Sequence, residues 1–262
     1  MAEPTPAAPA EQLPIEPLNI LVVDDYPANR LLLSRQLSYL GHCTLEAKDG
    51  KQGLELWRNH PFDVVITDCN MPIMNGYELA GAIRDEEQAK GLEACLILGF
   101  TANAQREEKV RCGEAGMDDC LFKPISLRDL SARLASRNPG ATSIVPEEIK
   151  GQTSAEIDLS GLEQWVGADR TLINDLLREL ASSNEKDLAR LQDFYIDRDH
   201  DGLMELAHRI KGGARIVKAH RLILCCERLE AALGASDAAA LTQAVAALQQ
   251  SMERLTRYLG QH

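Results

Sequence analysis

Long apolar runs are missing from this sequence, and its first residues lack the pattern of a secretory leader. The longest uninterrupted apolar stretches, such as residues 20–23 and 222–226, are far shorter than the roughly 20 residues that a membrane-spanning helix needs. The N-terminal segment has neither basic residues nor an apolar core, which argues against a secretory signal peptide. The seven cysteines include no C-x-x-C pair, and an odd number of thiols without a secretion signal is typical of a reducing compartment. We therefore expect a cytoplasmic chain whose present segment makes no membrane contact.

Basic residues are also in deficit. The chain has 28 Lys and Arg against 40 Asp and Glu, a net charge of -12, which argues against nucleic acid as the main partner. Hydrophobic residues at 45% and charged residues at 26% exclude global disorder, and 262 residues suit two domains rather than one.

Proline is absent after Pro146, whereas five of the eleven prolines lie within residues 4–17. The proline-rich start predicts an extended tail, and the long Ala- and Leu-rich tract without proline predicts a helical bundle. The predicted division is a tail, an α/β domain, a polar interdomain linker and a helical domain: residues 1–18, 19–137, 138–154 and 155–262.

The α/β domain alternates between two hydrophobic periods. Short apolar or β-branched runs predict five strands, at residues 19–23, 43–47, 62–67, 95–100 and 120–122. Amphipathic stretches between them predict five helices, at residues 27–40, 50–60, 76–87, 104–115 and 126–136. This alternation predicts a five-stranded, doubly wound parallel sheet, with a ligand crevice at the carboxyl ends of the strands.

Those strand ends carry reactive side chains. The first strand ends in Asp24 and Asp25, the third in Asp68, the fourth in Thr101 and the fifth in Lys123. Converging carboxylates repel one another unless a cation lies among them, and carboxylate oxygens with water suit Mg²⁺. A lysine and a hydroxyl beside the metal could hold the remaining oxygens of a phosphoryl group. A lone aspartate would be read as a cap or turn former, but the combination predicts a site for phosphoryl chemistry.

Residues 21–25, 68–76, 101–102 and 123–124 together resemble the motifs of the receiver domain of two-component response regulators, which has a flavodoxin-like or CheY-like fold. The resemblance implies that Asp68 is the phospho-acceptor and that Mg²⁺ is the cofactor.

The resemblance also assigns roles around Asp68. Asp25 and Asp68, with the backbone carbonyl of Asn70, would bind Mg²⁺ directly, and Asp24 would act through water. Lys123 would pair with the phosphoryl oxygens and would precede Pro124 through a cis peptide bond. Thr101 would move to hydrogen-bond the phosphoryl group.

One position departs from the receiver pattern. Receivers usually carry an aromatic residue three positions before the lysine, and this sequence has Cys120 there. The usual aromatic switch coupled to Thr101 is therefore in doubt. Cys69, next to Asp68, is expected to be a small buried hydrophobe rather than a redox centre.

The helical domain contains one informative helix, predicted at residues 201–218. Its apolar residues lie on the side of the helix opposite His208: Leu203, Leu206, Ile210 and Val217. His208 then shares an exposed arc with Lys211, Gly212 and Arg215. An exposed imidazole can act as a nucleophile, the glycine removes a side chain that would block a phosphoryl donor, and the two cations add positive charge. An isolated surface histidine would carry no such meaning.

Residues 207–214 resemble the H-x-x-K-G signature of histidine phosphotransfer (HPt) domains, which are four-helix bundles without catalytic activity of their own. The resemblance implies that His208 is phosphorylated, with Lys211, Gly212 and Arg215 in support.

A receiver followed by an HPt domain resembles the C-terminal arrangement of hybrid sensor histidine kinases, and residues 62–124 are similar to those of the BvgS and EvgS type. This implies a phosphorelay from an upstream histidine kinase to Asp68, then to His208, then to the aspartate of a downstream response regulator. No ATP-binding kinase fold is expected in this chain, so it is either the cytoplasmic piece of an inner-membrane sensor kinase or a free-standing protein. Two alternatives stay open: a phosphate sink that hydrolyses phospho-Asp68, and a binding scaffold without relay.

Overall fold

The structure, a computed structural model, describes residues 17–102, 106–135, 170–235 and 237–259. Almost all of the predicted tail, the whole of the predicted linker 138–154 and residues 155–169 lie outside these ranges.

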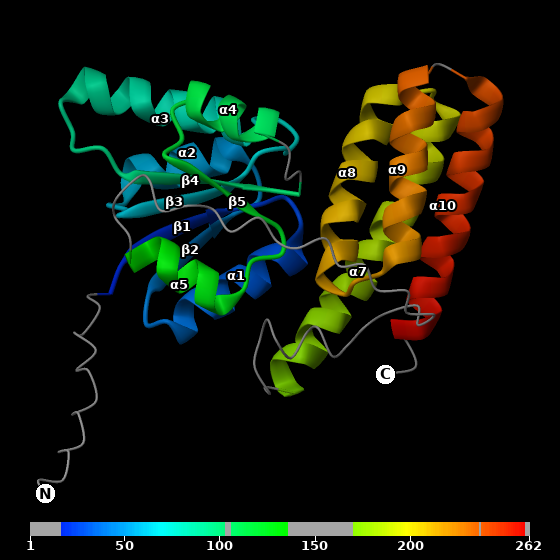
Figure 1. The fold of residues 1–262 in the computed structure, drawn as a ribbon, viewed down its shortest axis with the longest axis horizontal. Coiled ribbons are helices and arrows are strands. Elements are labelled where there is room, and N and C mark those ends of the chain that lie inside the picture. Colours follow the sequence, from blue (N-terminus) through cyan, green and yellow to red (C-terminus); the bar gives the residue numbers. More distant parts are fainter. Residues whose placement is uncertain (1–16, 103–105, 136–169, 236, 260–262) are drawn as a thin grey trace, which may run out of the picture.

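The first domain is the expected five-stranded parallel sheet, in the order β2-β1-β3-β4-β5 (Figure 1). The strands are β1 (Asn19–Val23), β2 (Cys43–Ala47), β3 (Val64–Asp68), β4 (Leu96–Thr101) and β5 (Asp119–Phe122). The helices are α1 (Pro27–Tyr39), α2 (Gly50–Asn59), α3 (Gly76–Lys90), α4 (Arg106–Glu114) and α5 (Leu127–Ala135). The third and fourth strands end one residue later than predicted, because Asp68 still pairs with Phe100, and Thr101 with Phe122, in the parallel ladder.

Alternating side chains of β1 divide the core between the two faces of this sheet. Ile20 and Val22 pack with residues of α1 and α5, whereas Leu21 and Val23 pack with residues of α2, α3 and α4. Figure 1 shows α1 and α5 below the sheet and α2, α3 and α4 above it. Both faces of a parallel sheet must be covered in this way, which leaves the carboxyl edge free to carry polar side chains.

The second domain is an all-α bundle, as predicted. Within the described residues it consists of α7 (Arg170–Ile196), α8 (His200–Ile216), α9 (His220–Ala235) and α10 (Ala238–Leu259). The α8 helix begins where the Asp199 side chain accepts a hydrogen bond from the backbone N–H of Gly202 at 2.9 Å. This cap satisfies one of the N–H groups that the first turn of a helix leaves without a partner.

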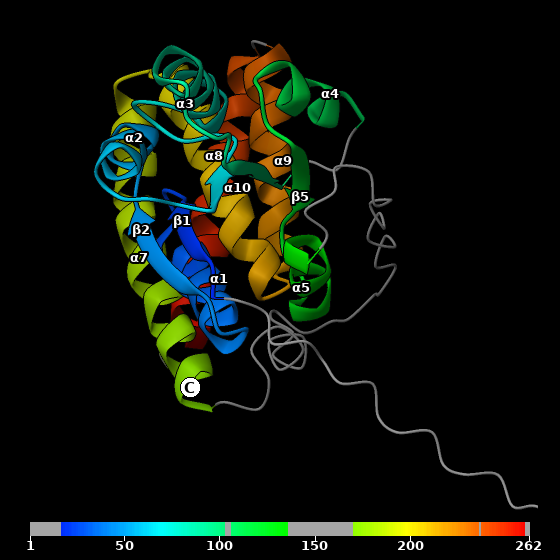
Figure 2. The same cartoon turned by 90° about the vertical axis from the view of Figure 1, so that its left-hand side faces the viewer.

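The two domains pack against each other through α1. Tyr26, Ala28 and Leu32 belong to the same buried apolar cluster as the core of the bundle, and α1 contacts α7 and α8. Figures 1 and 2 show α1 at the edge of the first domain that faces the bundle. The carboxyl edge of the sheet is thereby turned toward α8.

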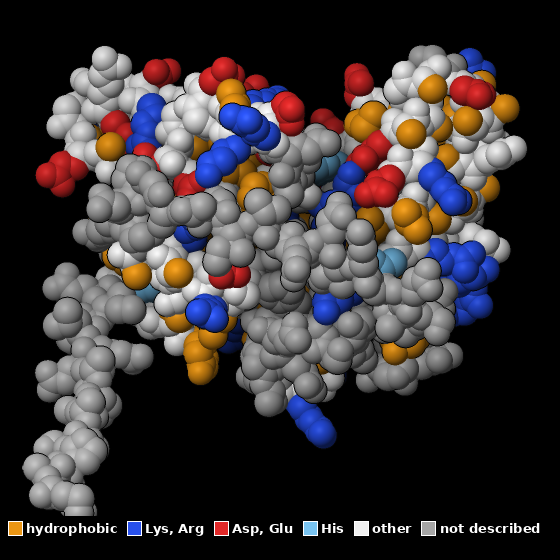
Figure 3. Space-filling model, viewed as in Figure 1, with side chains coloured by type: hydrophobic (Ala, Val, Ile, Leu, Met, Phe, Trp, Pro, Cys, Tyr) orange, Lys and Arg blue, Asp and Glu red, His pale blue; other side chains and the backbone are white. Residues whose placement is uncertain are grey.

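No helix among the described residues has the length and apolar character that crossing a bilayer requires. On the face seen in Figure 3, acidic and basic side chains are interspersed.

Candidate functional site

Three buried carboxylates meet at the carboxyl edge of the sheet. Oxygen atoms of Asp24, Asp25 and Asp68 all lie within 4.8 Å of one another, and each of the three side chains is buried. Burial, together with the nearby charges of Asp24 and Asp25, raises the pKa of Asp68 well above its usual range, although Lys123 opposes that rise. Crowded carboxylates of this kind are the ligand set of a hard divalent cation. The residues therefore fit a magnesium ion, as the sequence predicted.

Lys123 lies between two of these carboxylates. Its Nζ is 2.6 Å from Oδ2 of Asp24 and 2.7 Å from Oδ2 of Asp68. Burial alone would lower the pKa of Lys123, but the two carboxylates outweigh this effect and raise it, so the ammonium stays charged. The peptide bond to Pro124 is cis, as predicted, and the backbone N–H of Lys123 donates to the carbonyl of Thr101 at 2.7 Å. A permanent cation thus lies beside Asp68, close to the buried Thr101.

Asp24 is held by two neighbours that the sequence analysis did not identify. Its Oδ1 accepts the backbone N–H of Tyr26 at 2.8 Å, and Asn29 Nδ2 donates to both carboxylate oxygens at 3.1 Å. Asn29 lies on the first turn of α1, so this helix fixes the orientation of the carboxylate. Asn29 shares the buried side of α1 with Leu32 and Leu33, and this spacing was the signal available in the sequence.

His208 lies on the face of α8 that is turned to the first domain. Its Nε2 is 3.1 Å from Nδ2 of Asn70, the second residue after Asp68. Because an amide nitrogen can only donate, Nε2 accepts this bond and the proton lies on Nδ1. Burial, and then the positive charges of Lys211, Lys123 and Arg215, lower the pKa of His208 to about 4. The imidazole is therefore neutral near pH 7, with the lone pair of Nε2 directed to the crevice.

The sequence predicted that one arc of α8 is exposed, and this prediction is wrong for the docked chain. The arc consists of His208, Lys211, Gly212 and Arg215, all of which are buried or partly buried. His208 points away from the core of its own bundle, but the first domain covers it and leaves it only partly exposed. Arg215 reaches across in the same way and donates to the backbone carbonyl of Ala102. The periodicity of one helix cannot reveal that another domain covers its polar face.

The other two residues expected to support His208 have different surroundings. Lys211 pairs with Glu230 of α9, with Nζ 2.6 and 2.7 Å from the two carboxylate oxygens, so its charge is already balanced within the bundle. A Cβ atom on Gly212 would meet only Nδ2 of Asn29, at 3.7 Å, which is an ordinary contact. The close approach belongs instead to the next residue, Gly213, where a Cβ would lie 2.3 Å from the ring of Tyr26.

Arg209 is the functional candidate that sequence reasoning missed. Its NH1 group donates to a carboxylate oxygen of Asp25 at 2.8 Å and to the Asp25 backbone carbonyl at 3.1 Å. Its Nε lies 3.2 Å from Oδ1 of the buried Asp187 on α7. Burial raises the pKa of Asp25 to about 6, and Arg209 opposes part of that rise. Arg209 follows His208 directly, yet no motif marked it, because its role depends on a carboxylate 184 positions away in the chain.

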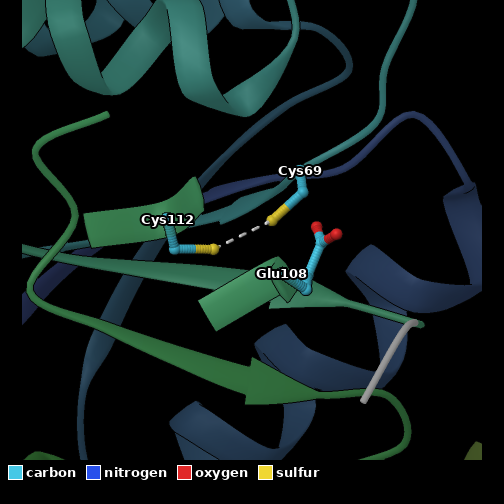
Figure 4. A group of neighbouring side chains, drawn as sticks. All are labelled: Cys69, Glu108 and Cys112. Atoms are coloured by element: carbon cyan, nitrogen blue, oxygen red, sulfur yellow. Dashed lines mark hydrogen bonds between the residues drawn. The ribbon is translucent and has the colours of Figure 1, made fainter. Parts of the chain in front are cut away.

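A group of thiols fills the core next to Asp68. The sulfur atoms of Cys69 and Cys112 are 3.8 Å apart, and the carboxylate of Glu108 lies beside them (Figure 4). The contact with Cys112 is the main cause that raises the pKa of Cys69 to about 12, so this thiol is protonated and packs as a small hydrophobe, as expected. Cys120, at the position of the usual switch aromatic, is buried in the same cluster. Cys69, Cys112 and Cys120 therefore pack together in the buried cluster on the side of the sheet covered by α2, α3 and α4.

Two protein families match this chain. Residues 20–135 match the response regulator receiver domain, and residues 175–258 match the Hpt domain. The virulence sensor protein BvgS of Bordetella bronchiseptica is 43% identical over 230 residues, which cover 83% of this chain and 19% of that protein. The sensor protein EvgS of Escherichia coli K12 is 36% identical over 229 residues, which cover 86% of this chain and 18% of that protein. The chain thus spans about a fifth of the length of these curated relatives.

Solved structures are also similar to the first domain. The receiver domain of the sensor histidine kinase PA1611 from Pseudomonas aeruginosa, with a magnesium ion coordinated in its active site cleft, is 30% identical, with a TM-score of 0.41. The match covers 45% of this chain and 94% of that chain.

Proposed function

Since the chain belongs to the two-component phosphorelay proteins, with a receiver domain and an Hpt domain homologous to those of hybrid sensor kinases, we propose that it passes a phosphoryl group from Asp68 to His208. Receiver and Hpt domains together indicate phosphorelay signal transduction. The residues that carry the phosphoryl group, the metal and the partners are our proposal.

In the first step Asp68 accepts the phosphoryl group from an upstream phosphohistidine. Asp25, Asp68 and the backbone carbonyl of Asn70 would hold Mg²⁺, with Asp24 acting through water. When bound, the metal supplies positive charge to the phosphoryl oxygens. Lys123 lies 2.7 Å from Asp68 and is suited to hold a further oxygen, and Thr101 would donate its hydroxyl to the group.

In the second step Nε2 of His208 attacks the phosphorus atom. A nitrogen–phosphorus bond forms, the bond from phosphorus to the Asp68 oxygen breaks, and the carboxylate leaves with its electron pair. The observation that carries this proposal is the 3.1 Å contact between His208 Nε2 and Asn70 Nδ2. It supports a direct transfer, because the neutral imidazole already faces the crevice that contains Asp68.

The partners follow from the two ends of this relay. The donor to Asp68 would be a histidine kinase, either a separate protein or another part of the same polypeptide. The acceptor from His208 would be the aspartate of a separate receiver domain. Because the kinase draws on ATP, we expect the relay to operate in the cytoplasm.

The test follows a labelled phosphoryl group. The chain is incubated with Mg²⁺ and labelled acetyl phosphate, and wild type is compared with Asp68→Asn and His208→Gln. We expect base-labile label on Asp68 that passes to acid-labile label on His208, and no label on His208 in Asp68→Asn.

Two results would contradict the relay. Label that stays on Asp68 and is lost to water, with none on His208, would favour a phosphate sink. Absence of label on both residues, in a folded chain with Mg²⁺ bound, would favour a binding scaffold.

A further inference from the structure

Arg209 joins the two domains at the metal site itself. One end of its guanidinium bonds the carboxylate and the carbonyl of Asp25, and the other end lies against Asp187 of α7. Its charged group also lies 5.3 Å from the centre of the Tyr26 ring, and its side chain is only 15% exposed. A buried guanidinium with two carboxylate partners is a fixed charge rather than a mobile surface group.

Asp25 is also a carboxylate that would bind Mg²⁺ directly. A guanidinium bound to the same side chain neutralises it and places a positive charge next to the metal position, and both effects weaken the attraction for a second cation. The Arg209 guanidinium and Mg²⁺ would therefore compete for the carboxylate of Asp25.

We propose that Arg209 is a resident cation that competes with Mg²⁺ for Asp25, so that docking of the Hpt domain and binding of the metal oppose each other. The proposal rests on the proposed function in one respect, the assignment of Asp25 as a magnesium ligand. The metal-free chain is held docked by Arg209, and Mg²⁺ weakens that contact. By thermodynamic linkage, docking weakens Mg²⁺ binding by the same factor.

The structure gives the metal access while the domains are docked. A cavity of about 430 Å³ opens next to Asp25, and both domains line it, through Asn70 and Pro72 on one side and His208 and Arg209 on the other. The partner left to Arg209 after it releases Asp25 is Asp187, which is buried on α7. Arg209 can thus leave one carboxylate without losing the other.

The test is a calorimetric titration of the full chain with MgCl₂, without any phosphoryl donor. We expect Arg209→Gln to bind Mg²⁺ at least about fivefold more tightly than wild type, the lower end of typical coupling between sites. Asp25→Asn should abolish or strongly weaken binding in both backgrounds. The control is Arg221→Gln, which removes an exposed arginine of α9 and should leave the affinity at the wild-type value.

A second variant guards against local misfolding. Arg209→Gln alone leaves the buried Asp187 with Arg190, 3.9 Å away, as its remaining ion-pair partner among the described residues. Arg209→Gln with Asp187→Asn removes both charges and keeps a polar amide at each position. The double variant should show the same tighter binding. Equal or weaker Mg²⁺ affinity in both variants would overturn the competition, as would unchanged binding in Asp25→Asn. Because the titration involves no phosphoryl transfer, these outcomes are independent of whether label reaches His208.

Discussion

Gly213 of α8 packs its backbone directly against the ring of Tyr26. A Cβ atom at this position would lie 2.3 Å from Cε1 and 2.5 Å from Cζ of Tyr26, distances that no packed side chain can keep. Within α8 a glycine costs about 1 kcal/mol relative to alanine. The absence of a side chain at Gly213 therefore allows the contact with Tyr26 of the receiver domain, although glycine destabilises α8 itself.

We predict that Gly213→Ala separates docking from stability. Overpacking costs typically about 1–3 kcal/mol, so transfer of label from Asp68 to His208 should slow by about tenfold. The melting temperature of the bundle should stay equal or rise, since alanine favours the helix. Pulse labelling with acetyl phosphate and a thermal melt give the two readings.

Gly234→Ala is the matched control, because a Cβ there meets nothing within 4 Å. It should leave the transfer rate at the wild-type value. A Gly213→Ala chain that transfers label as fast as wild type would show that the Tyr26 contact does not limit transfer.

At the scale of the elements, a histidine ties the end of α1 to the start of β1. Nδ1 of His42 accepts the backbone N–H of Leu18 at 3.3 Å, and the backbone N–H of His42 donates to Leu37 at 3.0 Å. Burial lowers the pKa of His42 below its ordinary value near 6.5. The folded receiver domain therefore prefers the neutral ring, which keeps Nδ1 as an acceptor.

This preference predicts a loss of stability in mild acid. Below about pH 6.5 the unfolded chain takes up a proton that the folded chain refuses, so the free energy of unfolding falls as pH decreases until the folded pKa is reached. In His42→Gln this part of the pH dependence should vanish. Urea denaturation at pH 7.5 and 5.5 measures it, with His60→Gln, an exposed histidine at the end of α2, as the control. An equally steep loss in His42→Gln would refute the assignment.

At the scale of the whole molecule, α1 serves two cores at once. Leu32 packs into the cluster shared with the bundle, whereas Leu37 packs into the receiver core on the opposite side of the helix. His208 faces its own receiver, so a second receiver can reach it only after this interface opens. In the proposed relay, docking would thus favour transfer within the chain and oppose transfer out of it.

Leu32→Ala and Leu37→Ala should separate these two roles. Truncation of a buried leucine costs about 2–5 kcal/mol, and in Leu32→Ala part of that cost falls on docking. We expect slower transfer from Asp68 to His208, and faster transfer from phospho-His208 to a second copy of the chain that carries His208→Gln. Leu37→Ala should lower the free energy of unfolding of the receiver without speeding transfer to the second copy. Equal rates of outward transfer in the two variants would contradict this division.

The ends of the strands were predictable from local sequence patterns. The order of apolar and polar residues predicted the five strands and the carboxylates and lysine at their ends, because parallel strands bring their carboxyl ends to one edge. The cis bond before Pro124 was implied by the resemblance to receiver domains rather than by this pattern. For α8, helical periodicity correctly turned His208 away from the core of its own bundle. These features depend on neighbours within a few positions along the chain.

The contacts that join the domains depend on residues far apart in the chain. Arg209 meets Asp25 across 184 positions, and Asn70 meets His208 across 138, so no local pattern marks either pair. Burial of His208, the need for glycine at Gly213 and the pairing of Lys211 with Glu230 likewise arise only when separate helices pack. The sequence alone therefore predicted the groups that we propose for phosphoryl chemistry. Tertiary packing decided which of them face one another, because that depends on the apolar surface that α1 buries against α7 and α8.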